Sequence, residues 1–199
     1  MKNMKVRITL MEDMLGTAPN NKEIYSDYIA SKAPVEKDTK DEIDSVPELE
    51  DMRQMTVFHR NPETDKPIIY DYLIKGFFKN ACNAMREVPK SESSKLKAYK
   101  KKIDNLVFVG PRMIDINMSG EMTICERPLR AATAQGERVA LTSSESVPAG
   151  STLEFEITCL SDDMMNYVIE WLDYGKFNGL GQWHNSGKGR FTWTDITEE

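Results

Sequence analysis

The sequence predicts a single α+β domain, residues 1–199, around an antiparallel ferredoxin-like sheet of element order βαββαβ that carries insertions. Three observations support this class. Apolar and polar residues alternate in segments 4–10 and 153–159, as half-buried strands require. Apolar residues recur at helical spacing in segments 72–85 and 161–174. The 199 residues are enough to form one hydrophobic core, and two full domains are not expected in a chain of this length.

In the first half of the chain, alternating Val6, Ile8 and Leu10 predict the opening strand. Residues 34–54 carry two prolines, no apolar periodicity and eight acids against three bases, which predicts a mobile surface insertion. A core-packed helix is then expected from Tyr72. Its apolar residues lie on one helical face: Leu73, Ile74, Phe77, Phe78, Ala81 and Met85.

The middle of the chain predicts strands. NLVFV at 105–109 is followed by RMIDINM and EMTICER, which flank Ser119 and Gly120 and predict a hairpin around a tight turn. The next segment, PLRAATAQGE at 128–137, has few apolar residues. It predicts a long exposed loop or a hairpin, and both alternatives stay open.

In the last part of the chain, the turn signal VPAG precedes the strand at 153–159. Ser161 is the expected N-cap of the following helix, whose apolar stripe is formed by Met165, Val168, Ile169 and Leu172. Gly175 is expected to end it in the left-handed conformation. Phe191, Trp193 and Ile196 then indicate a closing strand, which completes an order also described as RRM-like.

The net charge of −6 argues at first against a nucleic-acid partner, but the charge is unevenly distributed. Residues 34–54 contribute −5, whereas residues 86–102 hold seven bases against two acids, a net +5. A basic surface is therefore compatible with the acidic total. No apolar run approaches the ~18 residues of a membrane span, and the N-terminus lacks the apolar region of a signal peptide, which predicts a cytoplasmic protein.

The most informative segment is GKFNGLGQWHNSGKGRF at 175–191, which holds five glycines between the second helix and the last strand. It lacks the Walker pattern, and its helix-before-glycine order excludes a Rossmann fingerprint. Free amides, together with Lys176, Lys188 and Arg190, are expected to approach phosphates, while Trp183 and His184 offer stacking faces for bases. The alternative is a loop whose glycines serve only its packing.

Three segments, taken in order, are similar to one family. KPIIYDYLIKGFFKNAC at 66–82 is similar to that family's entrance into its first helix. ERVALTSSESVPAGSTLEFEI at 137–157 is similar to a stretch in which an acid, Val-Pro and Gly precede a strand. The pattern G-x-G-x-x-x-x-x-G-x-G-x-F at 179–191 resembles its glycine-rich loop. The family is the RAMP (repeat-associated mysterious protein) superfamily of CRISPR systems, and the resemblance is to its backbone subunits, which polymerise along guide RNA.

The chain also departs from that family. Tyr70, Asp71 and Tyr72 replace the small residues that bring the backbone close to RNA, and the chain is shorter than such subunits usually are. The opening MEDMLGTA, the helix IKGFFK and the loop GLGQW are similar to bacteriophage proteins of unassigned function. This resemblance implies a stand-alone phage or prophage relative in an infected or lysogenic bacterial cell.

Catalysis has little support in the residues. His184 is one of two histidines, and as a general base it would need a partner that the sequence does not supply. Ser143 to Glu145 lack a nucleophile elbow. Asp104, Asp115 and Glu126 form a metal site only if folding joins them. The three cysteines, at 82, 125 and 159, are expected to be reduced thiols, so we predict no catalytic residue, no metal and no cofactor.

The resulting hypothesis is non-catalytic binding of RNA or single-stranded nucleic acid within a homo-oligomer or multisubunit complex. One alternative is a phage protein that mimics nucleic acid through its acidic segment and disrupts a host CRISPR complex by binding its proteins. A second is a small endoribonuclease. The predicted nucleic-acid-binding residues are Lys75, Lys95, Lys97, Lys100, Lys101, Lys102, Arg127, Arg130, Gly179, Gly181, Trp183, His184, Gly187, Lys188, Gly189 and Arg190.

Overall fold

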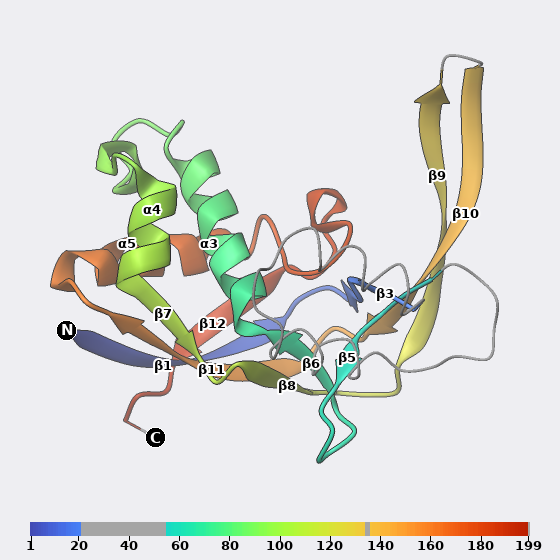
Figure 1. Ribbon diagram of the computed structural model, residues 1–199, viewed down its shortest axis with the longest axis horizontal. Coiled ribbons are helices and arrows are strands. Elements are labelled where there is room, and N and C mark those ends of the chain that lie inside the picture. Colours follow the sequence, from blue (N-terminus) through green and yellow to red (C-terminus); the bar gives the residue numbers. More distant parts are fainter. Residues whose placement is uncertain (21–54, 134–135, 199) are drawn as a thin grey trace, which may run out of the picture.

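The computed structural model describes residues 1–20, 55–133 and 136–198, with the side chains of 129–140 outside the description. In this part of the chain, three α-helices lie over one face of a seven-stranded sheet, and a second, five-stranded sheet carries a long projecting hairpin (Figure 1). The predicted α+β class with antiparallel sheets is confirmed. The predicted insertion at 34–54 lies outside the described residues, and the assignment of the chain to one domain stays a prediction.

The larger sheet is built around the predicted opening strand. β1 (Lys2–Leu10) pairs antiparallel with β11 (Thr152–Cys159) on one side and with β12 (Phe191–Asp195) on the other. β11 pairs in turn with β7 (Val107–Gly110) and β8 (Met113–Asn117), at successive positions along its length. β6 (Pro67–Tyr70) and β5 (His59–Arg60) complete the sheet beyond β8.

The three helices are α3 (Asp71–Met85), α4 (Tyr99–Leu106) and α5 (Asp162–Tyr174). The first and last confirm the two predicted helices. Their aromatic residues join the layers, since the Phe78 and Trp171 ring centroids lie 5.6 Å apart and the Phe77 and Phe191 centroids 5.1 Å apart. Burial of such large rings removes much apolar surface from water and fixes the helices against the sheet.

The smaller sheet contains β2 (Met14–Leu15), β3 (Ala18–Pro19), β4 (Met55–Val57), β9 (Thr123–Thr133) and β10 (Gly136–Val147). β10 pairs in parallel with β4 and antiparallel with β2 and β9. The ribbon of β9 and β10 extends well away from the body of the molecule (Figure 1). Of the two alternatives for residues 128–137, the structure therefore has the hairpin.

The predicted hairpin of 112–118 with 121–127 is wrong. β8 pairs with β6 and β11 in the larger sheet, whereas β9 pairs with β10 in the smaller one. The intervening residues cross between the sheets, and Ser119 is held by the 149–151 turn: its amide donates to Ser151 Oγ at 3.0 Å and its hydroxyl to the Ala149 carbonyl at 2.7 Å.

Details of the last helix also differ from expectation. Ser161 occupies the N-cap position but makes no side-chain cap bond. Gly175 ends the helix with φ −55°, a right-handed conformation. Its glycine identity has another cause, because a Cβ there would lie 2.4 Å from the Phe191 ring. Ile169, placed on the predicted apolar stripe, is 36% exposed, and the buried face instead includes Trp171.

No helix in the described ranges is both long enough and apolar enough to cross a bilayer.

Candidate nucleic-acid interface

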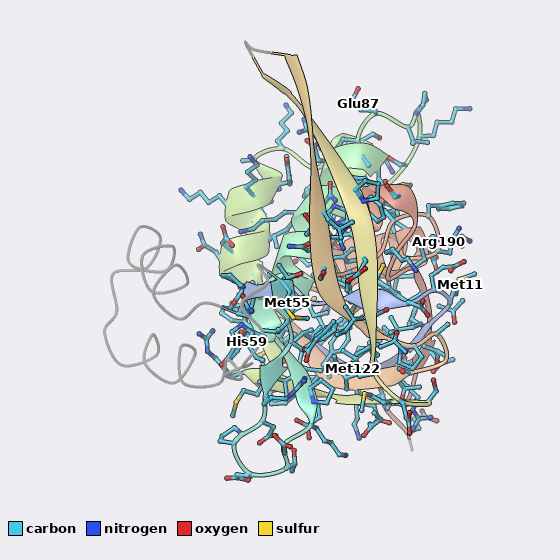
Figure 2. The ribbon with its side chains drawn as sticks, turned by 90° about the vertical axis from the view of Figure 1, so that its right-hand side faces the viewer. Met11, Met55, His59, Glu87, Met122 and Arg190 are labelled. Atoms are coloured by element: carbon cyan, nitrogen blue, oxygen red, sulfur yellow. The ribbon has the colours of Figure 1, made fainter. Side chains whose placement is uncertain are left out.

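The glycine-rich loop, residues 175–191, packs against the turn that follows β1. The Met11 amide donates to the Arg190 carbonyl at 2.7 Å, the Gly189 amide to the Asp13 carbonyl at 2.8 Å, and the Gln182 amide to the Leu15 carbonyl at 3.2 Å. Figure 2 shows Met11 and Arg190 next to each other. The opening segment MEDMLGTA and the loop segment GLGQW, both noted for the same resemblance, thus form one structural unit.

The loop's glycines are required by its own close packing. A Cβ on Gly179 would lie 2.1 Å from the Gly189 carbonyl carbon, and one on Gly189 would lie 2.0 Å from the Leu180 oxygen. Gly181 and Gly189 also have left-handed φ angles of 81° and 67°, which side chains disfavour. The expectation of free amides is wrong for six residues of the loop. Their amides donate to carbonyl oxygens of the protein: Leu180, Gln182, Ser186, Gly187, Lys188 and Gly189.

Of the loop's three predicted phosphate-binding cations, two are already paired with acids, and the third, Lys176, lies with its Nζ 5.3 Å from the Phe177 ring centroid. Lys188 Nζ lies 3.3 Å from Asp13 Oδ2, and Arg190 Nη2 lies 2.9 Å from Glu12 Oε1. A phosphate would have to compete with these carboxylates for either cation. The loop end is therefore close to electrically neutral, and its charge contributes little attraction for a polyanion.

Trp183 is an exposed residue of this unit and lies in contact with the buried Arg127. Trp183 is 38% exposed and has a left-handed φ of 59°, an uncommon conformation for an aromatic residue. The Arg127 Cζ lies 4.7 Å from the centroid of the Trp183 ring, within cation–π range. Arg127 itself, on β9, is only 4% exposed and donates to Ser144 Oγ at 2.8 Å and to Gln182 Oε1 at 2.6 Å.

His184 lies in the same loop but lacks the partner of a general base. Its Nδ1 is 3.0 Å from the Gly181 carbonyl oxygen, so this nitrogen is a hydrogen-bond donor within the loop. Among the described residues, His184 makes no hydrogen bond or ion pair with an acid. The geometry is that of a structural or contact residue rather than of an activated base.

Five of the other predicted lysines lie far along the chain from this loop, in the basic segment, residues 86–102. Lys95 ends the 3₁₀ helix η1 (Ser93–Lys95) and pairs with Glu92 at 3.0 Å, a contact that raises its pKa. Four further lysines are exposed and pair with no acid in the described ranges: Lys97, Lys100, Lys101 and Lys102. Their unpaired charges are a local source of positive potential.

One carboxylate of α5 holds the basic segment in place. Glu170 accepts hydrogen bonds from the Glu92 amide at 2.8 Å, the Ser93 amide at 2.9 Å and the Ser93 hydroxyl. Ser93 Oγ also accepts from the buried Trp171 Nε1 at 2.9 Å. Sequence reasoning missed Glu170 because a half-buried glutamate on an amphipathic helix gives no local sign of its partners.

Lys75 belongs to a third location, at the start of α3. Its Nζ donates to the Asp104 carbonyl at 3.3 Å and lies 5.1 Å from the Phe108 ring centroid, and burial lowers its pKa. Arg112, which sequence reasoning missed, lies near the exposed Tyr72, with 5.8 Å between its Cζ and the ring centroid. Arg130 lies on β9, and its side chain is outside the description. The predicted residues thus fall into separate groups.

The carboxylates that would have formed a metal site have other partners. Asp104 pairs with Lys79 at 2.6 Å, and Asp115 accepts from Asn61 Nδ2 at 2.7 Å. Within the described residues, no three His, Cys, Asp or Glu side chains come together as metal ligands do. All three cysteines are free thiols, and burial raises the pKa of Cys159 to about 11.

The sheet face opposite the helices offers no stacking platform on its central strands. The positions of β1 and β11 that alternate with the buried ones carry Lys5, Arg7 and Thr9, paired in register with Glu156, Glu154 and Thr152. RRM sheets bind bases through aromatic residues on this face. Any base stacking by this chain must therefore use residues outside β1 and β11.

No protein-family model and no curated protein matches the sequence. Among solved structures, the fold is similar to a chain in the cryo-EM structure of the Type III-B Cmr-beta bound to cognate target RNA, with a TM-score of 0.54 and 12% identity over 97% of this chain. This chain spans 59% of that one. A chain of a Type IV-B CRISPR complex gives a TM-score of 0.49 and 11% identity, covering 98% of this chain and 91% of the other. The fold is thus similar to that of a chain from the Type III-B Cmr-beta, at low sequence identity.

Proposed function

We propose that this chain binds RNA or another single-stranded nucleic acid without cleaving it, as a RAMP-like, backbone-type subunit of a homo-oligomer or multisubunit complex. The observation that carries the proposal is the group of four exposed lysines with no acid partner in the described ranges, Lys97, Lys100, Lys101 and Lys102. Such clusters attract phosphate backbones because binding releases condensed counterions.

The fold supports the family assignment. Strand order β12, β1, β11 and then β7, with α3 and α5 as the crossing helices, corresponds to the order 4-1-3-2 of a βαββαβ sheet. The Cmr-beta chain of similar fold comes from a complex with target RNA. Fold similarity alone does not carry function, so the surface chemistry has to agree with it.

We assign two tasks to two regions. The basic segment supplies phosphate contacts, and Trp183 supplies a stacking face for a base. Trp183 suits this task because it is exposed and because packed glycines hold its loop in one conformation. The projecting hairpin of β9 and β10 would lie alongside the bound nucleic-acid strand. The phage-encoded, stand-alone origin is part of this proposal and is supported only by the resemblance of the opening, helix and loop segments.

Binding is tested by fluorescence anisotropy with a labelled single-stranded RNA at several salt concentrations. Affinity should fall steeply as salt rises, and Trp183→Ala should cost about 1 to 3 kcal/mol of binding. The matched control is Trp193→Ala, which removes a partly buried indole whose Nε1 donates to Asp173 at 2.9 Å. No binding by folded protein at low salt would reject the proposal and favour the nucleic-acid mimic.

Cleavage and assembly are tested on the same material. The RNA should remain intact on a denaturing gel, and metal-independent cutting that is lost in His184→Phe would instead indicate a ribonuclease. Light scattering should show a larger mass with long RNA than without it, because copies that share one strand gain avidity. A monomer under both conditions would contradict the proposed assembly.

A further inference from the structure

The charge of Arg127 has no acid partner among the described residues, although the side chain is almost completely buried. Its relative exposure is 4%, and its neighbours are a serine hydroxyl, a glutamine carbonyl and an indole. A buried cation without a counter-charge is costly, and proteins rarely keep one unless something compensates for it.

Comparison with the other arginines emphasises this exception. Four of them contact a carboxylate: Arg7 with Glu154, Arg60 with Glu145, Arg112 with Asp71 and Arg190 with Glu12. Arg86 is exposed to solvent and lies over the Tyr99 ring. Within the described side chains, Arg127 alone combines burial with the lack of an acid.

Arg127 also retains an unused donor. Nη1 donates to Ser144 Oγ at 2.8 Å and Nη2 to Gln182 Oε1 at 2.6 Å, but the buried Nε has no hydrogen-bond partner. Ser144 is itself fixed by a 2.6 Å hydrogen bond to Thr56 Oγ1. The guanidinium is therefore held in orientation by neutral groups, and it keeps an uncompensated charge and a buried N–H without an acceptor.

The indole of Trp183 lies over this guanidinium and is not fixed by a hydrogen bond of its own within the described residues. Cation–π contact joins the two groups at 4.7 Å, and the indole Nε1 makes no hydrogen bond within the described part of the chain. By contrast, the Nε1 atoms of Trp171 and Trp193 donate to Ser93 and Asp173. Rotation of the Trp183 side chain would therefore break no hydrogen bond of the indole.

We propose that Arg127 and Trp183 form a subsite for one nucleotide of a single strand, in which the phosphate binds the guanidinium and the base stacks on the indole. The inference rests on the proposed function and adds to it a specific phosphate contact outside the basic segment. A phosphate is favoured over a protein carboxylate because the cation lies next to an exposed aromatic ring, the pair of groups that a nucleotide needs.

The first test compares the salt dependence of RNA binding. Arg127→Met keeps the packing volume and removes the charge, so the slope of log K against log salt should decrease by about 0.7, the value for one phosphate contact on a single strand. The control is Lys5→Met, which removes one cation from the face of the larger sheet that lies opposite the helices. This variant should leave the slope unchanged. An unchanged slope in folded Arg127→Met would overturn the subsite and leave the proposed function standing.

The second test uses the unmodified protein and does not depend on a variant that folds. Uridine 5′-monophosphate should raise the melting temperature and change tryptophan emission more than uridine does at equal concentration, and Trp183→Phe should abolish the emission change. Equal effects of nucleotide and nucleoside would overturn the subsite. A nucleotide effect without any RNA binding would instead reject the proposed function and retain a mononucleotide site.

Discussion

The glycine-rich loop and the basic segment both carry clustered cations, but the two clusters differ in whether their cations pair with acids. In the loop, Lys188 and Arg190 pair with Asp13 and Glu12 from the turn after β1. In the basic segment, the lysines from Lys97 to Lys102 are exposed, and the acid Glu170 binds backbone amides instead of the lysine side chains.

This difference shows that the number of basic residues in a segment does not give its potential. Cations in the loop serve to attach it to the N-terminal turn, which lies 175 positions away in the sequence. In the basic segment, Glu170 binds the amides of Glu92 and Ser93, and no acid in the described ranges pairs with Lys97, Lys100, Lys101 or Lys102. In the proposed function, the loop supports Trp183 and the basic segment supplies the electrostatic attraction.

The largest expected effect is a loss of stability when the close packing of the glycine-rich loop is disturbed. Gly189→Ala places a Cβ 2.0 Å from the Leu180 oxygen at a φ of 67°, so the free energy of unfolding should fall by about 3 kcal/mol, measured by urea denaturation. The control is Gly76→Ala on α3, where nothing lies within 4 Å of the added Cβ. That variant should be about 0.5 to 1 kcal/mol more stable. Equal stabilities would show that the loop is not rigid.

A second variant tests the source of attraction. Replacing Lys97, Lys100, Lys101 and Lys102 by glutamine should lower the salt slope of RNA binding by as much as about 3, at ~0.7 for each phosphate contact. Stability should change by less than about 0.5 kcal/mol, because these side chains are exposed. Replacing Lys188 instead should change the slope little. A larger loss from Lys188 than from the four lysines together would reverse the comparison.

The smallest effect concerns the anchor of the basic segment. Glu170→Gln keeps the shape and removes the charge that accepts from two amides and a hydroxyl, so stability should fall by about 1 kcal/mol. RNA affinity should fall several-fold with an unchanged salt slope, since no phosphate-binding cation is lost. Hydrogen exchange of the Glu92 and Ser93 amides should accelerate. Protection equal to that of the unaltered protein would argue against an anchoring role.

Most of the larger sheet and its two long helices could be predicted, because their periodicity is local. Val6, Ile8 and Leu10 alternate wherever β1 finally packs, and Phe77, Phe78 and Ala81 mark one face of α3 in isolation. The false hairpin around Ser119 has a physical cause. Two adjacent strand patterns indicate pairing by proximity, but Ser119 bonds to the distant 149–151 turn, and the two strands enter different sheets.

The sequence allowed candidate residues of the site to be proposed, but it did not predict their burial or their partners. Trp183 was identified as a stacking residue from its glycine-rich surroundings, and its partial exposure is compatible with that role. Burial of Arg127 depends on the register of β9 with β10 and on contact with Gln182, which no local pattern encodes. Paired and unpaired cations are likewise indistinguishable in sequence, because Lys188 finds its acid at the other end of the chain.

The joining of the N-terminal turn to the glycine-rich loop also orders events during synthesis. Leu15 is synthesised before Gln182, so its carbonyl can accept the Gln182 amide only after Gln182 has left the ribosome. In the same way, one edge of β1 stays unpaired until β12 has been synthesised. The basic segment needs only α3, α4 and later α5, so its contacts are closer in sequence. A nascent chain can therefore expose its lysines before Trp183 is held in its loop, so in the proposed function the attraction of a polyanion would precede base stacking.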